Sequence, residues 1–262
     1  MSEKKLIVGE KDHVLMMELN RPEKRNAFDL EMYQELSLAY GELDQNPELR
    51  CGLLFAKGDH FTAGLDLPAW APFFTKGSFP DLPDKGIDPL GLDEKTRVSK
   101  PIVMAVQGIC FTIGIELLLA ADIRVISNTT RMGQIEIKRG IYPVGGATVR
   151  LHQEIGWGNA MRYLLTADEI TAKEAFRLGL VQEITEPEDL FDKAFEIAQT
   201  IAKQSPLGVQ ATLKSGRIAR SQGDQAAIKR LLPDLMPIMK SEDFTEGIQS
   251  FIERREACFK GI

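Results

Sequence analysis

The sequence contains few cysteines and has no excess of positive charge. Its three cysteines, Cys51, Cys110 and Cys258, are odd in number and lie far apart. They form neither a disulfide framework nor a zinc-binding spacing, so we expect no bound metal and a reducing compartment. The 32 basic and 38 acidic residues give a formal net charge of −6. This balance argues against nucleic-acid binding, although a few lysines and arginines are enough to hold a small anionic ligand.

The sequence also lacks the signals of export and membrane insertion. The N-terminal stretch MSEKKLIVGE has no apolar core of the kind found in a signal peptide. Residues 102–121 are nearly apolar and long enough to be considered as a membrane span. Polar residues and glycines interrupt that segment at Gln107, Gly108, Thr112, Gly114 and Glu116. A buried strand leading into a buried helix explains this pattern better, so we expect a cytoplasmic protein without membrane contact.

Short apolar runs alternate with helical patterns in the first half of the chain. Runs of strand length occupy residues 13–19, 51–56, 102–106 and 123–127. After Asp29, a candidate N-cap, apolar residues recur at spacings of three and four, which predicts a helix. A further helix is expected around residues 117–121. Strands that alternate with helices predict an α/β core.

The remainder of the chain has two different patterns. Residues 73–96 are rich in proline and glycine and have no sustained period, which predicts a long loop or an irregular cover. Such loops often form lids or binding walls, and a disordered surface insertion is the alternative. From about Gly145 the sequence is mostly helical in character, with Gly179 closing one helix and Pro206 opening another.

Two glycine-containing turns and two carboxylates are the candidate functional residues. Glu116 lies in an otherwise apolar helix, where a buried carboxylate must be paired, protonated or used. Gly114, just upstream, and Gly64, in the segment HFTAGLDL, each follow a strand and permit turns that expose backbone N–H groups. Donors from two such turns can form an oxyanion hole. Glu136 supplies a second carboxylate, and two carboxylates in one pocket can divide acid and base roles.

These residues resemble the crotonase (enoyl-CoA hydratase/isomerase) superfamily over essentially the whole chain. LNRPEKRNAF (residues 19–28) is similar to the family's first CoA-binding segment, and HFTAGLDL (60–67) to its first oxyanion turn. Residues 100–125, KPIVMAVQGICFTIGIELLLAADIRV, resemble the strand and helix that carry the second turn and the first catalytic glutamate. Residues 165–184 and 246–261 match later helical signatures. Five such segments in the right order are a specific match.

The resemblance implies an architecture that composition does not show. The expected fold is an α/β spiral of ββα units, crotonase-like, with a helical C-terminal region that mediates trimerisation. Residues 1–200 would form the core domain with the active site, and residues 201–262 the helical oligomerisation region. The expected assembly is a homotrimer or a dimer of trimers. No cofactor is expected, because coenzyme A is part of the acyl-CoA substrate.

The resemblance also implies roles for individual residues. The backbone N–H groups of Leu65 and Ile113 would hold the thioester oxygen, and Glu116 and Glu136 would be the catalytic glutamates. Which glutamate is the acid stays open, since a close pair titrates jointly. Lys24 and Arg25 are expected to contact CoA phosphates, with a solvated loop charge as the alternative. The full set of expected CoA and substrate contacts is Lys24, Arg25, Ala27, Ala63, Gly64, Asp66, Leu67 and Gly114.

The expected reaction is hydration of a 2-trans-enoyl-CoA. Alternatives are double-bond isomerisation, thioester hydrolysis or decarboxylation, and a CoA-thioester-binding or oligomer-forming module without turnover. Val144 stands where dienoyl-CoA isomerases have an aspartate, which counts against that branch. Two further departures affect the pocket: Thr112-Ile113-Gly114 replaces three successive glycines, and Ile135 replaces a proline. Together with a longer loop after Asp66, they leave the preferred acyl group open.

Overall fold

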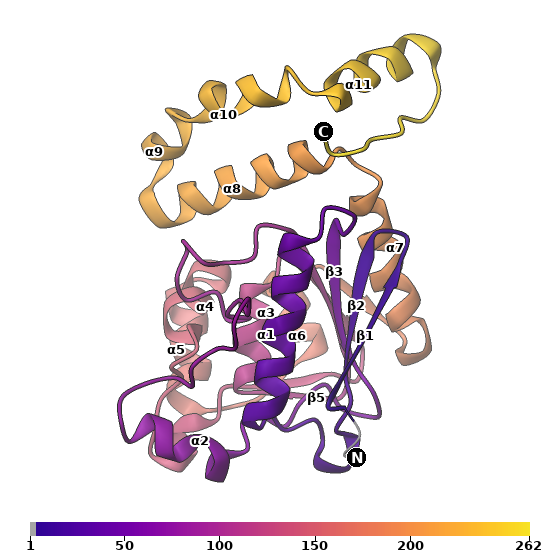
Figure 1. Cartoon of the computed structure of the whole chain (residues 1–262). Helices are drawn as coiled ribbons and strands as arrows, with labels where there is room; N and C mark the ends of the chain where they lie inside the picture. Colours follow the sequence, from indigo (N-terminus) through magenta and orange to yellow (C-terminus); the bar gives the residue numbers. More distant parts are fainter. Residues whose placement is uncertain (1–3) are drawn as a thin grey trace.

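The computed structural model, which describes residues 4–262, has a six-stranded sheet at its centre (Figure 1). The first two strands form an antiparallel hairpin, and the other neighbouring pairs are parallel. In spatial order the strands are β1 (Leu6–Lys11), β2 (Val14–Leu19), β3 (Cys51–Ala56), β4 (Ile102–Val106), β6 (Ile123–Ser127) and β9 (Glu183–Thr185). The four predicted strands are confirmed. Three of them have the predicted bounds, and β2 begins one residue later than expected.

A second, smaller sheet lies beside the first and leads directly into the candidate site. Its central strand, β7 (Arg131–Gly133), pairs in parallel with β5 (Ile109–Phe111) and antiparallel with β8 (Ile170–Thr171). These strands have only two or three residues each, too few for a periodic pattern to appear in the sequence. Their pairing nevertheless places the end of β5 next to the end of β7.

The helices cover both faces of the large sheet and continue beyond it. α1, after its Asp29 N-cap, and α3 lie on one face, and α7 packs on the other. The α-helices of the core are α1 (Leu30–Gln45), α2 (Leu67–Phe74), α3 (Ile113–Ala120), α4 (Ala147–Ile155), α5 (Trp157–Thr166), α6 (Ala172–Arg177) and α7 (Leu190–Ala202). Short 3-10 helices are η1 (Pro22–Lys24), η2 (Glu136–Arg139) and η3 (Pro187–Asp189).

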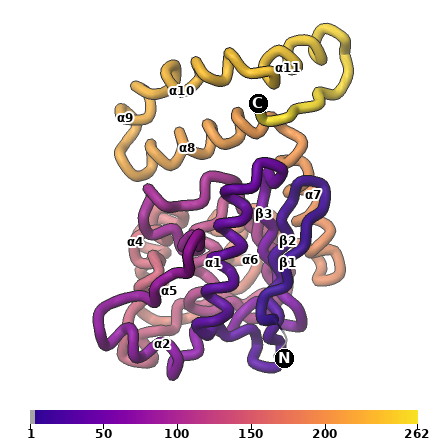
Figure 2. The backbone as a smooth tube through the Cα atoms, viewed as in Figure 1, coloured from indigo at the N-terminus to yellow at the C-terminus, as the bar shows by residue number. Residues whose placement is uncertain are grey.

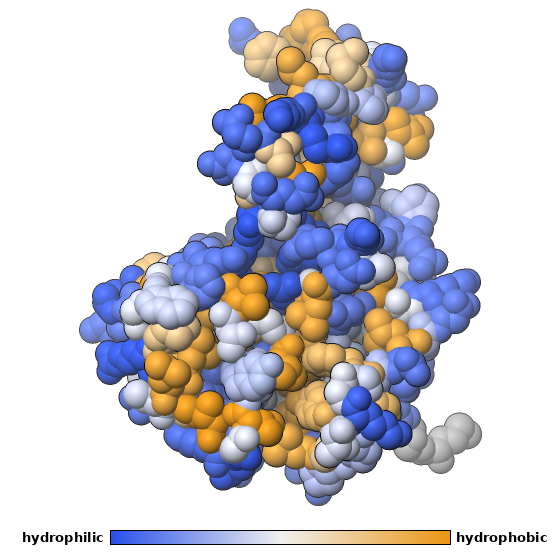
Figure 3. All heavy atoms as spheres, turned by 90° about the vertical axis from the view of Figure 1, so that its left-hand side faces the viewer, coloured by the Kyte–Doolittle hydropathy of each residue, from blue (hydrophilic) through white to orange (hydrophobic). Residues whose placement is uncertain are grey.

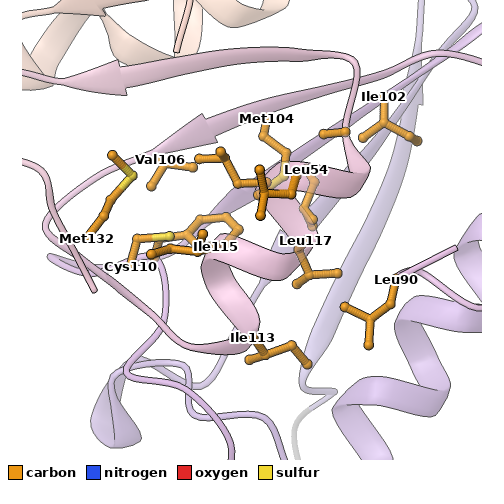
Figure 4. Packing of buried hydrophobic residues seen from close by; sticks show 14 of the residues in the cluster. Leu54, Leu90, Ile102, Met104, Val106, Cys110, Ile113, Ile115, Leu117 and Met132 are labelled. Atoms are coloured by element: carbon orange, nitrogen blue, oxygen red, sulfur yellow. The ribbon is translucent and has the colours of Figure 1, made fainter. Parts of the chain in front are cut away.

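Alternating residues of the parallel strands fill a core on each side of the sheet. Leu54 and Met104 face the larger cluster with α1 and α3, whereas Leu53 and Val103 face the cluster with α7. Figure 4 shows Ile115 and Leu117 of α3 among side chains of the strands. Because α3 is buried all round, every residue from Ile113 to Ala120 is shielded from water, Glu116 included.

The segment 102–121 is therefore core and not a membrane span. It consists of β4, β5 and α3, as the sequence pattern predicted apart from the short β5 and an earlier start of the helix. Within residues 4–262, none of the helices combines the length and the apolar character that crossing a membrane requires.

The proline- and glycine-rich segment is an irregular cover held by specific contacts. Tyr33 donates from its hydroxyl to Asp88 at 2.6 Å, and Arg150 of α4 donates to the carbonyls of Leu90 and Gly91. The alternative of a disordered insertion is wrong for this segment. The sequence did not predict α2 just before it, whose buried Trp70 donates from its indole N–H to the Phe28 carbonyl at 2.9 Å.

The C-terminal helices form a layer that extends away from the sheets (Figure 2). They are α8 (Pro206–Gln222), α9 (Asp224–Ile228), α10 (Leu231–Ile238) and α11 (Glu242–Glu253). The predicted opening of α8 by Pro206 and closure after α6 by Gly179, at φ +78°, are confirmed. The chain end returns to this layer, where buried Asp243 accepts from the N–H groups of Lys260 and Gly261 at 2.7 and 3.0 Å.

Candidate active site

The two turns expected to form an oxyanion hole are brought side by side by isolated β-bridges. Leu65 pairs with Phe28, and Thr62 pairs with Cys110 of β5, both in parallel. The Thr62 N–H donates to the Ile109 carbonyl at 3.0 Å, and the Thr62 carbonyl accepts from Phe111 N–H at 3.0 Å. Residues 62–65 therefore continue the sheet across the start of α3.

The first of these bridges leaves the N–H of Leu65 available. Phe28 N–H donates to the Gly64 carbonyl at 2.9 Å, and Asp66 N–H donates to the Phe28 carbonyl at 2.8 Å. These bonds use the backbone groups on either side of Leu65. Within the part of the chain that the structure describes, Leu65 N–H itself has no hydrogen-bond acceptor.

The N–H of Ile113 is available for a different reason. Ile113 is the first residue of α3, and first-turn N–H groups have no acceptor within a helix. Thr112 N–H donates to the Gly133 carbonyl at 2.9 Å, and Thr112 carbonyl accepts from Ile115 and Glu116. Among residues 4–262, no acceptor faces the Ile113 N–H. Both predicted donors are thus unoccupied and at the positive end of a helix or beside it.

Glycine is required at both turns because neighbouring side chains fill the space that a Cβ would need. Gly64 has φ +113°, and a Cβ at this position would overlap the Thr112 hydroxyl. At Gly114 a Cβ would lie 2.7 Å from Thr62 Cγ2 and 2.9 Å from Cys110 Sγ. The two glycines therefore allow contact between the turns as well as exposing their amides.

Thr112 has an unfavourable backbone conformation for a β-branched residue. Its φ of +50° and ψ of −113° lie in a region that favours glycine. Its hydroxyl is buried and, within the described residues, has no hydrogen-bond partner. The departure from glycine noted in the sequence therefore carries a cost in both strain and polar burial.

Glu116 is a buried carboxylate held by backbone groups from a distant segment. Its side chain is 5% exposed, and Oε1 accepts from Gly145 N–H at 2.6 Å and from Ala147 N–H at 3.3 Å. Burial raises the pKa of Glu116 to about 7, against the opposing effect of these two N–H groups and of Arg150. Sequence reasoning missed Gly145, where a Cβ would overlap the carboxylate.

Glu136 is the second buried carboxylate, at the start of η2. It is 9% exposed, and burial raises its pKa to about 7, with the negative charge of Glu116 adding to the rise. The two glutamates are therefore close enough to interact. Gln134, also missed by sequence reasoning, is 2% exposed and lies beside Glu136. One end of its amide faces only acceptors, so the nitrogen belongs there, 2.9 and 3.1 Å from the Glu136 carboxylate oxygens.

The expected CoA segment lies next to the first turn. Ala63 N–H donates to the Arg25 carbonyl at 2.9 Å, so residues 24–27 run beside residue 63. Buried Asn26 anchors this segment, because its amide nitrogen donates to the carbonyls of Lys57 and His60 at 2.9 and 2.8 Å. The side chains of Lys24 and Arg25 are exposed and available to an anionic group.

The other predicted contacts have mixed surroundings. The Ala27 carbonyl and the Asp66 carboxylate both accept from Arg21, at 2.8 and 3.2 Å. Asp66 occupies the N-cap position of α2 without making a side-chain cap bond, and exposed Leu67 begins that helix. Across residues 4–262, no group of three or more histidine, cysteine or acidic side chains is arranged to hold a metal ion.

Comparison with known proteins decides the family. The sequence pattern of the enoyl-CoA hydratase/isomerase family matches residues 9–261. The chain belongs to this family. The predicted crotonase-like α/β fold is also confirmed. A crystal structure of a probable enoyl-CoA hydratase/isomerase from Mycobacterium abscessus superposes with a TM-score of 0.95 at 47% identity, covering 98% of this chain and 99% of that one.

Members of the enoyl-CoA hydratase/isomerase family with different reactions resemble this chain to a similar degree. The enoyl-CoA hydratase EchA19 of Mycobacterium tuberculosis is 34% identical over 97% of this chain and 96% of its own length. A mitochondrial Δ3,5-Δ2,4-dienoyl-CoA isomerase of Dictyostelium discoideum is 31% identical over 92% of this chain and 86% of its own length. Overall similarity therefore indicates the family and does not distinguish between these reactions.

Proposed function

We propose that this protein is an enoyl-CoA hydratase that adds water across the double bond of a 2-trans-enoyl-CoA. The observation that carries the proposal is the combination of Glu116 and Glu136, two interacting buried carboxyl groups, with two unoccupied N–H groups. A pKa of about 7 for both glutamates allows one to be ionised and the other protonated near neutral pH. Hydration requires this combination, since it removes one proton and delivers another.

In the proposed mechanism the N–H groups of Leu65 and Ile113 bind the thioester oxygen. The glutamate pair holds a water molecule, and the ionised member removes its proton as the water oxygen bonds to the β-carbon. The electrons of the double bond move toward the thioester and form an enolate, which the two N–H groups stabilise. A proton is then delivered to the α-carbon, which completes the hydroxyacyl-CoA. We assign the acid and base roles to the pair jointly, because coupled groups share their titration.

The remaining contacts belong to the CoA part of the substrate in this proposal. Lys24 and Arg25 are positioned to bind phosphate groups, and the backbone at Ala27 and Ala63 borders the path to the thioester. Gly64, Asp66, Leu67 and Gly114 complete the lining. The chemistry needs no cofactor beyond the substrate's own coenzyme A, and a cytoplasmic location stays a prediction.

Isomerisation is the second candidate because an isomerase is among the similar proteins. It requires one base that moves a proton between carbons and no activated water. The aspartate expected for the dienoyl branch is absent, since Val144 occupies that position and is 40% exposed. The two glutamates therefore favour hydration over this alternative.

We further propose that residues 1–200 act as the catalytic core and residues 201–262 as an oligomerisation region. Large apolar side chains are exposed on α9–α11, including Leu232 (72%) and Phe251 (84%). Figure 3 shows a second apolar area on the face with α2, α4 and α5. Trp157, the first residue of α5, is 67% exposed. Two separate apolar surfaces suit a homotrimer or a dimer of trimers, which light scattering after size-exclusion chromatography would detect.

The reaction is tested with crotonyl-CoA. Loss of the conjugated thioester absorbance together with incorporation of labelled solvent oxygen supports hydration. Movement of the double bond without oxygen uptake would show isomerisation instead. Release of free coenzyme A would indicate thioester hydrolysis, and tight binding without any product over hours would indicate a binding module. A panel of enoyl-CoA substrates of different length would then define the acyl group.

A further inference from the structure

Gln134 connects the second glutamate to the turn that carries the Ile113 N–H. Its amide nitrogen lies 2.9 and 3.1 Å from the two carboxylate oxygens of Glu136 and 3.3 Å from the Thr112 carbonyl oxygen. Thr112 immediately precedes Ile113, and its carbonyl also accepts from the first turn of α3. One buried amide therefore contacts both halves of the site.

The Glu136 carboxylate has few other groups that favour its ionised form. Its own backbone N–H is one such group. The charged side chain that bears on it is Glu116, which has the same sign and is itself bound by Gly145 and Ala147 near Arg150. Lys138 and Arg139, on η2 itself, are exposed to water. Gln134 is thus the one side-chain hydrogen-bond donor to this carboxylate within residues 4–262.

We propose that Gln134 is a positioning residue for the reaction, which keeps Glu136 ionised and fixes it relative to the Ile113 N–H. The proposal rests on the assignment of Glu136 to the acid–base pair, and it goes further by making Glu136 the ionised member of that pair. An amide N–H₂ group donates to both oxygens of a carboxylate, whereas a protonated carboxyl group offers it one good acceptor. Gln134 therefore favours the anion, and it opposes burial and the charge of Glu116.

The consequence is a specific pH dependence. When the donor is removed, the Glu136 carboxyl group must hold its proton to a higher pH, because only its own backbone N–H then opposes burial and the charge of Glu116. The acidic limb of kcat/KM moves to higher pH, and the loss of activity relative to the unmodified protein becomes smaller as the pH is raised. A hydrogen bond to a charged group corresponds to a shift of about one pH unit or more. A merely structural role for Gln134 would lower the rate by the same factor at every pH.

The first test compares Gln134→Met with the unmodified protein between pH 5 and pH 9.5, with crotonyl-CoA as substrate. Methionine has a similar volume and no donor. We expect a rate about tenfold lower at pH 7 and within about threefold of the unmodified protein at pH 9. Gln107→Met is the matched control, because Gln107 donates to the Ala56 and Gly58 carbonyls and, within residues 4–262, its side chain makes no hydrogen bond to a carboxylate. Its pH midpoint stays unchanged.

A second test needs no turnover and so separates this proposal from the proposed hydratase activity. Urea unfolding measures how much Gln134→Met destabilises the protein at pH 5 and at pH 9. We expect a larger loss at pH 9, where Glu136 is ionised, and no such pH dependence when Glu136→Gln is also present. An equal loss at both pH values, or an unshifted kinetic midpoint, would overturn the proposal. Failure of the unmodified protein to hydrate any enoyl-CoA would instead refute the hydratase assignment.

Discussion

Replacing Glu116 with glutamine should stabilise the protein at alkaline pH while it removes activity. A carboxyl group whose pKa is raised by folding binds its proton more tightly in the folded state than in the unfolded state. Its contribution to stability is present at low pH and is lost as the pH rises from the unfolded value toward the folded value. For Glu116 these values are 4.5 and about 7.

The magnitude follows from that difference. A shift of one pKa unit corresponds to about 1.36 kcal/mol. The rise in the pKa of Glu116 from 4.5 to about 7 therefore amounts to about 3 kcal/mol of unfavourable free energy once the carboxylate is ionised. Glutamine stays neutral, and its carbonyl can still accept from Gly145 N–H. We therefore expect the stability of Glu116→Gln relative to the unmodified protein to increase by about 2 to 3 kcal/mol between pH 5 and pH 8.

Urea unfolding at the two pH values measures this change. Glu154→Gln is the control with the opposite sign. Burial of Glu154 acts to raise its pKa, but Arg124 and Arg220 outweigh burial and lower it. The Glu154 carboxylate therefore stabilises the folded state at pH 8, and its removal costs more there than at low pH. The prediction compares the free energy of unfolding of Glu116→Gln with that of the unmodified protein. If their difference is the same at pH 5 and pH 8, folding does not raise the pKa of Glu116.

Three further substitutions test the site. Glu136→Gln should lower turnover by at least about a hundredfold, and near-normal steady-state rates would remove Glu136 from the mechanism. Gly145→Ala should displace the Glu116 carboxylate and lower kcat at least about tenfold. The circular dichroism spectrum should stay unchanged. A normal kcat would show that the contact between Gly145 and Glu116 is dispensable. Thr112→Gly should relieve backbone strain and raise the free energy of unfolding by about 1 kcal/mol, which a higher melting temperature would show. A lower melting temperature would contradict the claim that the Thr112 backbone is strained.

Elements with a complete local pattern were predictable from the sequence. The strands at 51–56, 102–106 and 123–127 are short, mostly apolar runs bounded by polar residues or proline, and α1 has both a cap and a periodic face. In contrast, β5, β7 and β9 have three residues each and exist because distant partners pair with them. No local signal predicted α2, whose LPAWAPFF segment contains two prolines.

The candidate site divides in the same way. Glycine-containing turns after strands and a carboxylate among apolar residues can be recognised in the sequence, and the family resemblance then assigned roles to Glu116, Glu136, Leu65 and Ile113. The supporting contacts carried no comparable signal. Gly145 and Asn26 look like ordinary loop residues, and Gln134 is one polar residue beside a short strand.

Local sequence already indicates that glycine permits the two turns and that Glu116 lies among apolar residues, because backbone freedom and apolar neighbours are local properties. Which atoms face those groups depends on how distant segments fold together. The N–H groups that bind Glu116 are 29 and 31 residues further along the chain. The pKa of each glutamate depends on such distant partners, since burial and neighbouring charge are properties of the folded molecule.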